Sequence, residues 1–263
     1  MILRKSLYLL FFMFCVSAVV WAGPPFETDD PEPTEYQHWE IYLGATALQL
    51  QGPGLFGTIP FLSVNYGGFP DTQLSLTEQV AFSPMPGGSS AYGYGDTLVG
   101  VKYRFIHEGA TVPQVAIFPQ VNIPTGDASK GLGNGVAQYL LPIWLQKSWE
   151  TWTTFGGAGY WINPGQGNKN WLFAGWEVQR DFGKGLTLGT EVFYHGASTV
   201  VLSDAVGSQS EGMGFNIGGE IHFDDVNHVV FSFGRDFIQT TYTLTSYVAY
   251  EWTFPNEPDE KGK

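Results

Sequence analysis

The chain has 263 residues and a formal net charge of −13, with abundant glycine and aromatic residues and only 14% charged residues. This acidic balance excludes the basic surface by which nucleic-acid-binding proteins hold phosphates. The single cysteine, Cys15, lies in the N-terminal segment, so we expect no disulfide, thiolate metal site or cysteine nucleophile in the rest of the chain.

The first predicted element is a signal peptide over residues 1–22. Arg4 and Lys5 precede an apolar run over residues 7–20, and the small residue Ala22 closes the segment. A charged start, a short apolar middle and a small-residue cleavage site are typical of export signals. The alternative, a transmembrane anchor, is disfavoured because a spanning helix needs about 20 apolar residues.

Residues 23–38 form an acidic, proline-rich segment, GPPFETDDPEPTEYQH. Its prolines prevent regular helix or sheet. Two interpretations remain open: a solvated tether, or a segment that folds back and narrows the entrance of the domain that follows. In the second case its acids would approach Lys102 and Arg104.

Residues 39–254 alternate in polarity, and residues 255–263 form a polar tail. In the last segment Leu244, Val248 and Trp252 share one face, and Thr245 and Glu251 share the other. Side chains of a strand alternate with a period of two, so each segment has an apolar and a polar face. We count about twelve such segments, starting near Trp39, Thr58, Thr72, Gly95, Pro113, Val136, Thr151, Asn170, Leu186, Gly212, His228 and Thr240.

Without a spanning helix in this region, a membrane protein must be a closed barrel, because only closure satisfies every backbone group in lipid. A soluble barrel would alternate in the same way, but the connections favour a membrane barrel. Short and long connections alternate, as in outer-membrane barrels. The short ones are 70–71, 150, 183–185 and 224–227, and the long ones are 83–94, 124–135, 163–169 and 197–211. We therefore predict an all-β fold: a closed antiparallel transmembrane barrel of about twelve strands, with short periplasmic turns and longer extracellular loops.

Aromatic residues gather at one end of the predicted strands. A ring of aromatic residues at one height of the barrel is typical of the girdle at a membrane interface, although aromatic residues also favour strands in general. The predicted girdle consists of Trp39, Phe69, Phe105, Trp149, Trp152, Phe182, Phe223, Trp252 and Phe254.

Charged residues on the polar face are predicted to line the lumen. Twelve strands fall between small barrels that side chains fill and large barrels that hold water channels, so we expect a narrow passage. The predicted lumen and transport residues are Glu40, Lys102, Arg104, Glu177, Glu191, Glu220, His222 and Glu251.

Several stretches carry a family resemblance. GPPFETDDPEP followed by WEIY, then GYGDTLVGVKYRF and PQVAIFPQVNIPTG, resemble the family of meta-pathway phenol degradation proteins over most of the exported chain. The resemblance implies an outer-membrane barrel that takes up small, often aromatic compounds.

The sequence gives little support for metal binding, cofactor binding or catalysis. The five histidines show no metal-ligand spacing and there is no GxSxG motif, so we predict no metal, no cofactor and no enzyme. Two alternatives remain: a structural or adhesive barrel that binds partners through its loops, and a membrane-embedded lipid hydrolase. For the hydrolase His195 and Ser198 are the nearest pair, but His195 faces inward and Ser198 begins a loop. The expected partners are the outer-membrane lipid bilayer and a small solute; the oligomeric state is left open.

Overall fold

The computed structural model describes residues 25–50, 54–85, 88–198, 211–238 and 241–255. The predicted signal peptide, including Cys15, and the polar tail after residue 255 lie outside these ranges. Within them, no helix is both long and apolar enough to cross a membrane.

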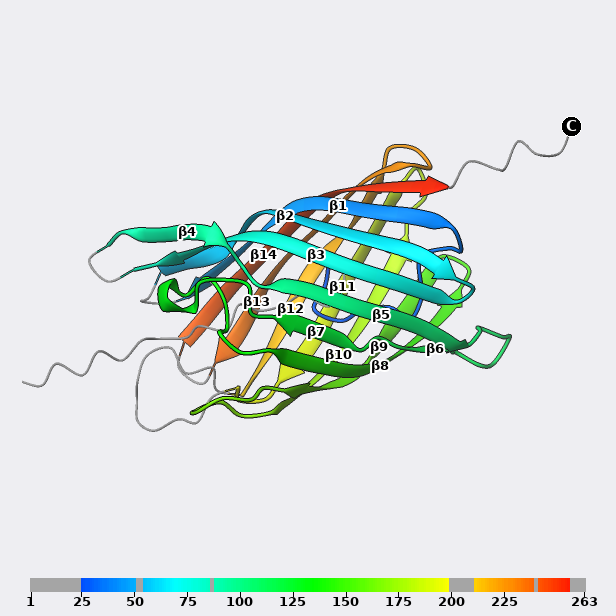
Figure 1. Cartoon of the computed structure of the whole chain (residues 1–263). Helices are drawn as coiled ribbons and strands as arrows, with labels where there is room; N and C mark the ends of the chain where they lie inside the picture. Colours follow the sequence, from blue (N-terminus) through cyan, green and yellow to red (C-terminus); the bar gives the residue numbers. More distant parts are fainter. Residues whose placement is uncertain (1–24, 51–53, 86–87, 199–210, 239–240, 256–263) are drawn as a thin grey trace, which may run out of the picture.

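The chain forms one closed antiparallel barrel (Figure 1). Its elements are β1 (His38–Leu50), β2 (Gly54–Phe69), β3 (Thr72–Pro84), β4 (Ser90–Tyr94), β5 (Thr97–Ile106), β6 (Gln114–Ile117), β7 (Gln120–Ile123), the short helix η1 (Ala128–Lys130), β8 (Gln138–Trp149), β9 (Trp152–Ile162), β10 (Trp171–Asp181), β11 (Leu186–His195), β12 (Gly212–His222), β13 (Asn227–Ile238) and β14 (Thr241–Pro255).

Closure comes from the pairing of the first and last strands. β1 pairs with β14 from His38↔Pro255 to Leu50↔Thr243, and each other strand pairs with its neighbours along the chain. β6 and β7 are two halves of one crossing, since both pair with β5 on one side and β8 on the other. β4 continues β5 beyond the barrel wall, so the barrel has 12 strands as predicted.

The predicted alternation of faces is confirmed along the strands. On β12 the side chain of Ile217 is 60% exposed, whereas that of Asn216 beside it is fully buried. On β5 Val101 is exposed and Lys102 is buried. An apolar exterior and a polar interior are what a barrel in lipid requires.

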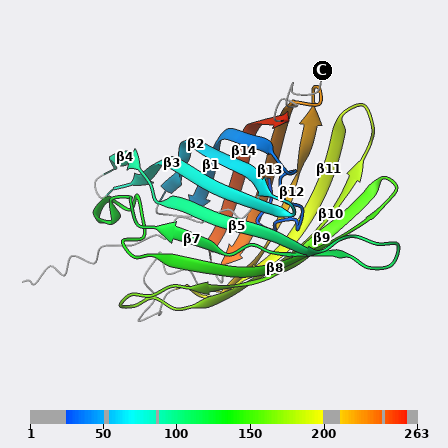
Figure 2. The same cartoon turned by 45° about the vertical axis from the view of Figure 1, so that its right-hand side comes forward.

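One predicted loop is wrong in part. Residues 83–94 were expected to be a long connection, but β3 and β4 pair across much of this stretch, from Val80↔Tyr94 to Pro84↔Ser90. Tyr92 and Tyr94 alternate with smaller residues, which favours a strand, and the hairpin projects past the barrel rim (Figures 1 and 2). The predicted loop at 197–211 lies largely outside the described residues.

The two ends of the barrel differ. Turns at 70–71 and 150–151, the start of β1 and the end of β14 gather at one end, which we call the turn end. Asp71 and Glu150 have positive φ angles of 57° and 50°, a left-handed conformation that lets these tight turns close. The connections at 124–137 and 163–170 lie at the opposite end, which we call the loop end, whereas the longest connection at the turn end is 107–113.

Candidate functional site in the barrel lumen

The N-terminal segment, which we define as residues 25–37, lies inside the barrel. Phe26, Thr28 and Asp29 are 1%, 2% and 4% exposed, and the segment is seen within the barrel behind the wall strands (Figure 2). Of the two interpretations of this stretch, the structure therefore supports the segment that folds back, and the solvated tether is wrong for these residues.

Glu191 on β11 holds the start of this segment. The backbone N–H groups of Glu27 and Thr28 donate to its two carboxyl oxygens, at 3.1 and 2.5 Å, and the Thr28 hydroxyl donates to the same group. On the other side the Asn216 amide donates at 2.7 Å. Glu191 is fully buried, so a single carboxyl group on the wall satisfies several buried donors of the segment.

A glycine in the wall makes room for this contact. A Cβ atom at position 175 would lie 2.0 Å from the Thr28 hydroxyl oxygen. Since any larger residue would collide there, Gly175 on β10 is part of the docking surface for the segment.

Lys102 on β5 holds the middle of the segment. Its Nζ lies 3.0 Å from Asp29 and 3.7 Å from Asp30, and it donates to the backbone oxygen of Glu32 at 3.3 Å. Arg104, two residues further along the same face, lies 3.7 Å from the Glu32 carboxylate. The contacts expected between the acids of the segment and these two cations are thus present.

Asp29 makes the Lys102 contact sensitive to pH. Burial raises the pKa of the Asp29 carboxyl to about 7, although the nearby Lys102 ammonium acts in the opposite direction. Protonation of Asp29 would convert this ion pair into a hydrogen bond from the Lys102 ammonium to a neutral acid.

The segment leaves the lumen beside β2 and β3. The Thr34 N–H donates to the Gln73 side chain at 2.8 Å, and the Gln37 N–H donates to the Gly67 carbonyl at 2.7 Å. A parallel bridge joins Tyr36 to Gly67. The chain then turns directly into β1, so the segment crosses the lumen near the turn end.

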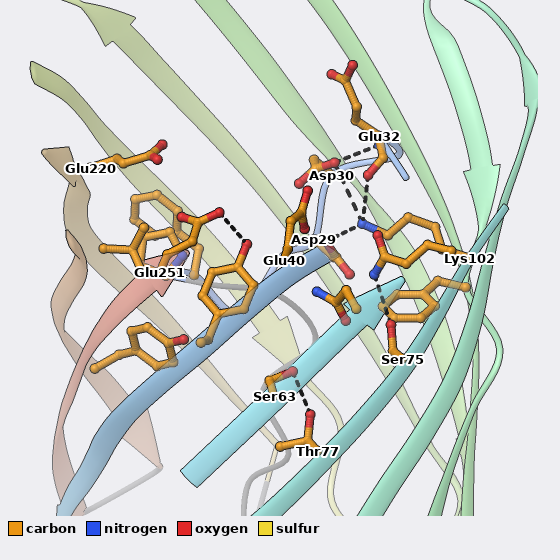
Figure 3. A pocket seen from close by; sticks show the side chains of 18 of the residues that line it. Asp29, Asp30, Glu32, Glu40, Ser63, Ser75, Thr77, Lys102, Glu220 and Glu251 are labelled. Carbon is orange, nitrogen blue, oxygen red and sulfur yellow. Dashed lines mark hydrogen bonds and ion pairs between the residues drawn. The ribbon is translucent and has the colours of Figure 1, made fainter. Parts of the chain in front are cut away.

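A cavity of about 520 Å³ lies beside the segment. Its wall comes mainly from the inward faces of β1–β3, β5 and β14, with further residues from β8–β10, β12 and β13, and the segment supplies one side (Figure 3). Its charged lining residues are Asp29, Asp30, Glu32, Glu40, Lys102, Glu220 and Glu251. Its aromatic lining residues are Phe26, Tyr42, Phe61, Phe118, Phe155 and Tyr247.

Part of the lumen next to β8–β11 is filled by apolar side chains. Phe118, Leu140, Trp144, Trp161, Phe173 and Phe193 form one buried apolar cluster. At the loop end the chain around η1 folds inward, because the Asp96 carboxylate accepts hydrogen bonds from the backbone N–H groups of Gly126 and Asn134, at 3.0 and 2.7 Å. The described cavity therefore lies mainly towards β1–β3, β5 and β14.

The predicted lumen residues divide into two groups. Glu40, Lys102, Glu220 and Glu251 line the cavity. Arg104, Glu177, Glu191 and His222 also lie on inward faces but do not line it. Of these, Glu177 is opposite Glu191 in the β10–β11 register and is fully buried. Side-chain alternation gave the face of each residue, but it could not separate open lumen from packed interior.

The predicted girdle residues lie at the turn end. Phe69, Trp149, Phe182 and Phe223 are more than half exposed, and Trp39 pairs with Phe254 in the β1–β14 register. The remaining members are Phe105, Trp152 and Trp252. Their location at a membrane interface stays a prediction.

Sequence spacing missed one cluster of possible ligands. His222 and His228 were judged too isolated to bind a metal, but they are paired across the β12–β13 hairpin. With Glu220 they place three ligand atoms within 4.8 Å of one another. The signal that could have found them is their equal distance, three residues each, from Asp225 in the tight turn, which places them side by side.

His195 and Ser198, the pair considered for a hydrolase, each have described contacts. His195 faces inward and its Nε2 lies 2.7 Å from the Asp236 carboxylate, while the backbone oxygen of Ser198 accepts from Lys169 and Asn163. These contacts give His195 and Ser198 structural partners.

A barrel with an apolar outside, a polar inside and unequal ends defines the class of outer-membrane β-barrels. The chain belongs to the family described as "Putative MetA-pathway of phenol degradation", whose model matches residues 41–252. The resemblance drawn from the sequence is thereby confirmed.

Solved structures give the same fold. An outer membrane channel from Pseudomonas putida F1 has a TM-score of 0.62 and 14% identity, covering 88% of this chain and 99% of that one. The KdgM porin has a TM-score of 0.54 and 11% identity, covering 81% and 99%. The translocator domain of the autotransporter NalP from Neisseria meningitidis has a TM-score of 0.50 and 10% identity, covering 82% and 87%. Comparison with curated protein sequences gave no significant match.

These likenesses concern the fold alone. Channels, porins and a translocator domain share it, so the function of this chain has to be argued from its own lumen.

Proposed function

We propose that the protein is a narrow outer-membrane channel for small solutes, with its turn end in the periplasm and its N-terminal segment as a constriction. The cavity of about 520 Å³ within the barrel carries this proposal. Its volume falls in the range of about 300–1,000 Å³ that is typical of sites for small molecules. The relatives described as an outer membrane channel and a porin support the same class.

The charge of the lining indicates which solutes pass. Carboxyl groups from the segment and from β1, β12 and β14 face the cavity, and among its described lining residues Lys102 is the only lysine or arginine. Lys102 is already paired with Asp29. A low-dielectric wall that carries one sign of charge concentrates ions of the opposite sign, so we expect cations and neutral solutes to be favoured over anions.

The aromatic lining narrows the solute class further. Rings such as Phe61 and Tyr247 line the same cavity as hydrogen-bonding groups such as Glu251 and Thr77. A neutral compound with an aromatic ring and a hydroxyl group can stack on the first and bond to the second. This class agrees with the family description, which names phenol degradation.

The constriction is held by polar contacts. The segment's described anchors include hydrogen bonds and ion pairs to Glu191, Lys102 and Gln73, and Phe26 and Pro31 are its fully buried apolar side chains. Contacts of this kind are exchanged for water on release at small net cost. The segment can therefore serve as a removable constriction instead of a permanent core.

Ion selectivity and solute uptake test this proposal. Purified protein in a planar bilayer with a KCl gradient should give a reversal potential of the sign for cation selectivity. Proteoliposomes should swell faster in a neutral phenolic solute than in a carboxylated aromatic of similar size. Anion selectivity, or equal rates for the two solutes, would contradict the proposed solute class. A barrel that conducts neither ions nor solutes under any condition would instead favour the structural or adhesive alternative.

A further inference from the structure

Glu220, His222 and His228 form a compact ligand cluster on the inward face near the turn end. The Nδ1 atoms of the two histidines are 2.7 Å apart. The Glu220 carboxylate lies 3.3 Å from His228 Nδ1 and 3.4 Å from His222 Nε2. All three ligands are half-buried or buried and belong to two adjacent strands.

The backbone around the cluster is fixed. His222 and His228 are direct neighbours in the register, and Glu220 is two residues before His222, so it shares the same face. The His222 N–H donates to the Gly185 carbonyl at 2.8 Å. The turn is closed by Asp224, whose carboxylate accepts from the backbone and side chain of Asn227 at 2.8 Å. Ligands on paired strands keep their relative positions better than ligands on loops.

We propose that this cluster is a binding site for a divalent transition-metal ion of the Zn²⁺ class. Imidazole nitrogen with one carboxylate is a ligand set that such ions take. With metal–nitrogen bonds of about 2.0–2.1 Å, two nitrogens in tetrahedral positions lie ~3.3 Å apart. The observed separation of 2.7 Å requires only a small opening of the two rings, which changes of side-chain torsion provide.

A second carboxyl group balances the charge. Glu251 on β14 is directly opposite His228 in the register, and it accepts a hydrogen bond from the Tyr42 hydroxyl at 2.9 Å. One metal ion with two neutral imidazoles and Glu220 keeps a net positive charge, which the Glu251 carboxylate can offset. A purely structural role for the cluster needs only His–Glu hydrogen bonds and predicts no metal affinity.

The site is independent of solute transport, because its metal affinity can be measured whether or not the barrel conducts. The experiment is a titration of ZnCl₂ into refolded protein without a histidine tag, followed by competition with a fluorescent zinc chelator. We expect saturable binding of about one Zn²⁺ per chain. His222→Ala and His228→Ala should each weaken the affinity at least tenfold.

His195→Ala is the matched control, because His195 is also an inward-facing histidine that contacts a carboxylate, but at the loop end. It should bind Zn²⁺ as tightly as the wild type. The difference in electrophoretic mobility between unheated and heated samples confirms that each variant forms the barrel. Glu220→Gln replaces any variant that does not form it. Absence of saturable binding by the wild type, or unchanged affinity in the His222→Ala/His228→Ala double variant, would overturn the proposal.

Discussion

Glu191→Gln is the sharpest perturbation of the N-terminal segment. In the wild type the two carboxyl oxygens of Glu191 accept separate backbone N–H groups, from Glu27 at 3.1 Å and Thr28 at 2.5 Å. A glutamine keeps one acceptor and turns an NH₂ group towards the other donor. A buried donor that loses its partner costs about 2 kcal/mol, which raises the undocked population of the segment about 30-fold.

A cysteine placed in the segment reports this population. Phe26 is 1% exposed, and the only native cysteine is Cys15, which a protein beginning at Gly23 lacks. We expect maleimide to label a Phe26→Cys variant slowly, and about 30-fold faster when Glu191→Gln is added, because labelling requires the undocked state.

Glu177→Gln is the matched control for this measurement. Glu177 is the cross-strand neighbour of Glu191 and is equally buried, but neither of its carboxyl oxygens has a hydrogen-bond partner among the described residues. It should leave the labelling rate within a fewfold of the parent. Equal acceleration by the two substitutions would show that general loosening of the barrel, and not the Glu191 anchor, controls the segment.

Two further predictions concern the wall and the turn end. Ile217→Arg, on an exposed side chain of β12, should destabilise the barrel in lipid by about 2–4 kcal/mol, whereas Ser75→Arg, which faces the cavity, should be far milder; similar urea midpoints for the two would mean that the faces are assigned wrongly. Hydrogen bonds from Arg104 hold the pKa of Asp71 below its ordinary value of 3.8, so the contribution of Asp71 to stability is present above that value and is lost as the pH falls through the lowered pKa. Asp71→Asn should remove the contribution of Asp71 to the acid dependence of the unfolding midpoint. An unchanged pH profile of the midpoint would refute this role of Asp71.

The barrel itself was predictable from the sequence because its determinants are local. The start of the predicted strands at Thr72, Leu186 and Gly212 agrees with the structure, since alternation along one strand already defines its two faces. β2 begins four residues earlier than predicted, at Gly54. Its first four residues are glycine, leucine and phenylalanine, so they show no alternation of polar and apolar side chains.

The site was less predictable because it depends on contacts across the chain. Lys102 and Glu191 were identified as inward-facing, but their partners are in a segment without periodicity, more than 70 residues away. The strand register also creates the metal-ligand cluster, since His222 and His228 become neighbours only when β12 and β13 pair. Sequence patterns describe single strands, whereas the docking of the N-terminal segment and the metal-ligand cluster both depend on how several strands are arranged.

In the proposed function the N-terminal segment narrows a conducting barrel. The most direct test compares single-channel conductance of the exported protein with that of a variant lacking residues 26–35, each at low and at high salt. We expect a small, salt-sensitive conductance for the intact protein, because the ion pairs at Lys102 and Arg104 are screened by salt. We expect a larger conductance for the deletion variant, with a weaker dependence on salt. Equal conductance and equal salt dependence of the two proteins would contradict it.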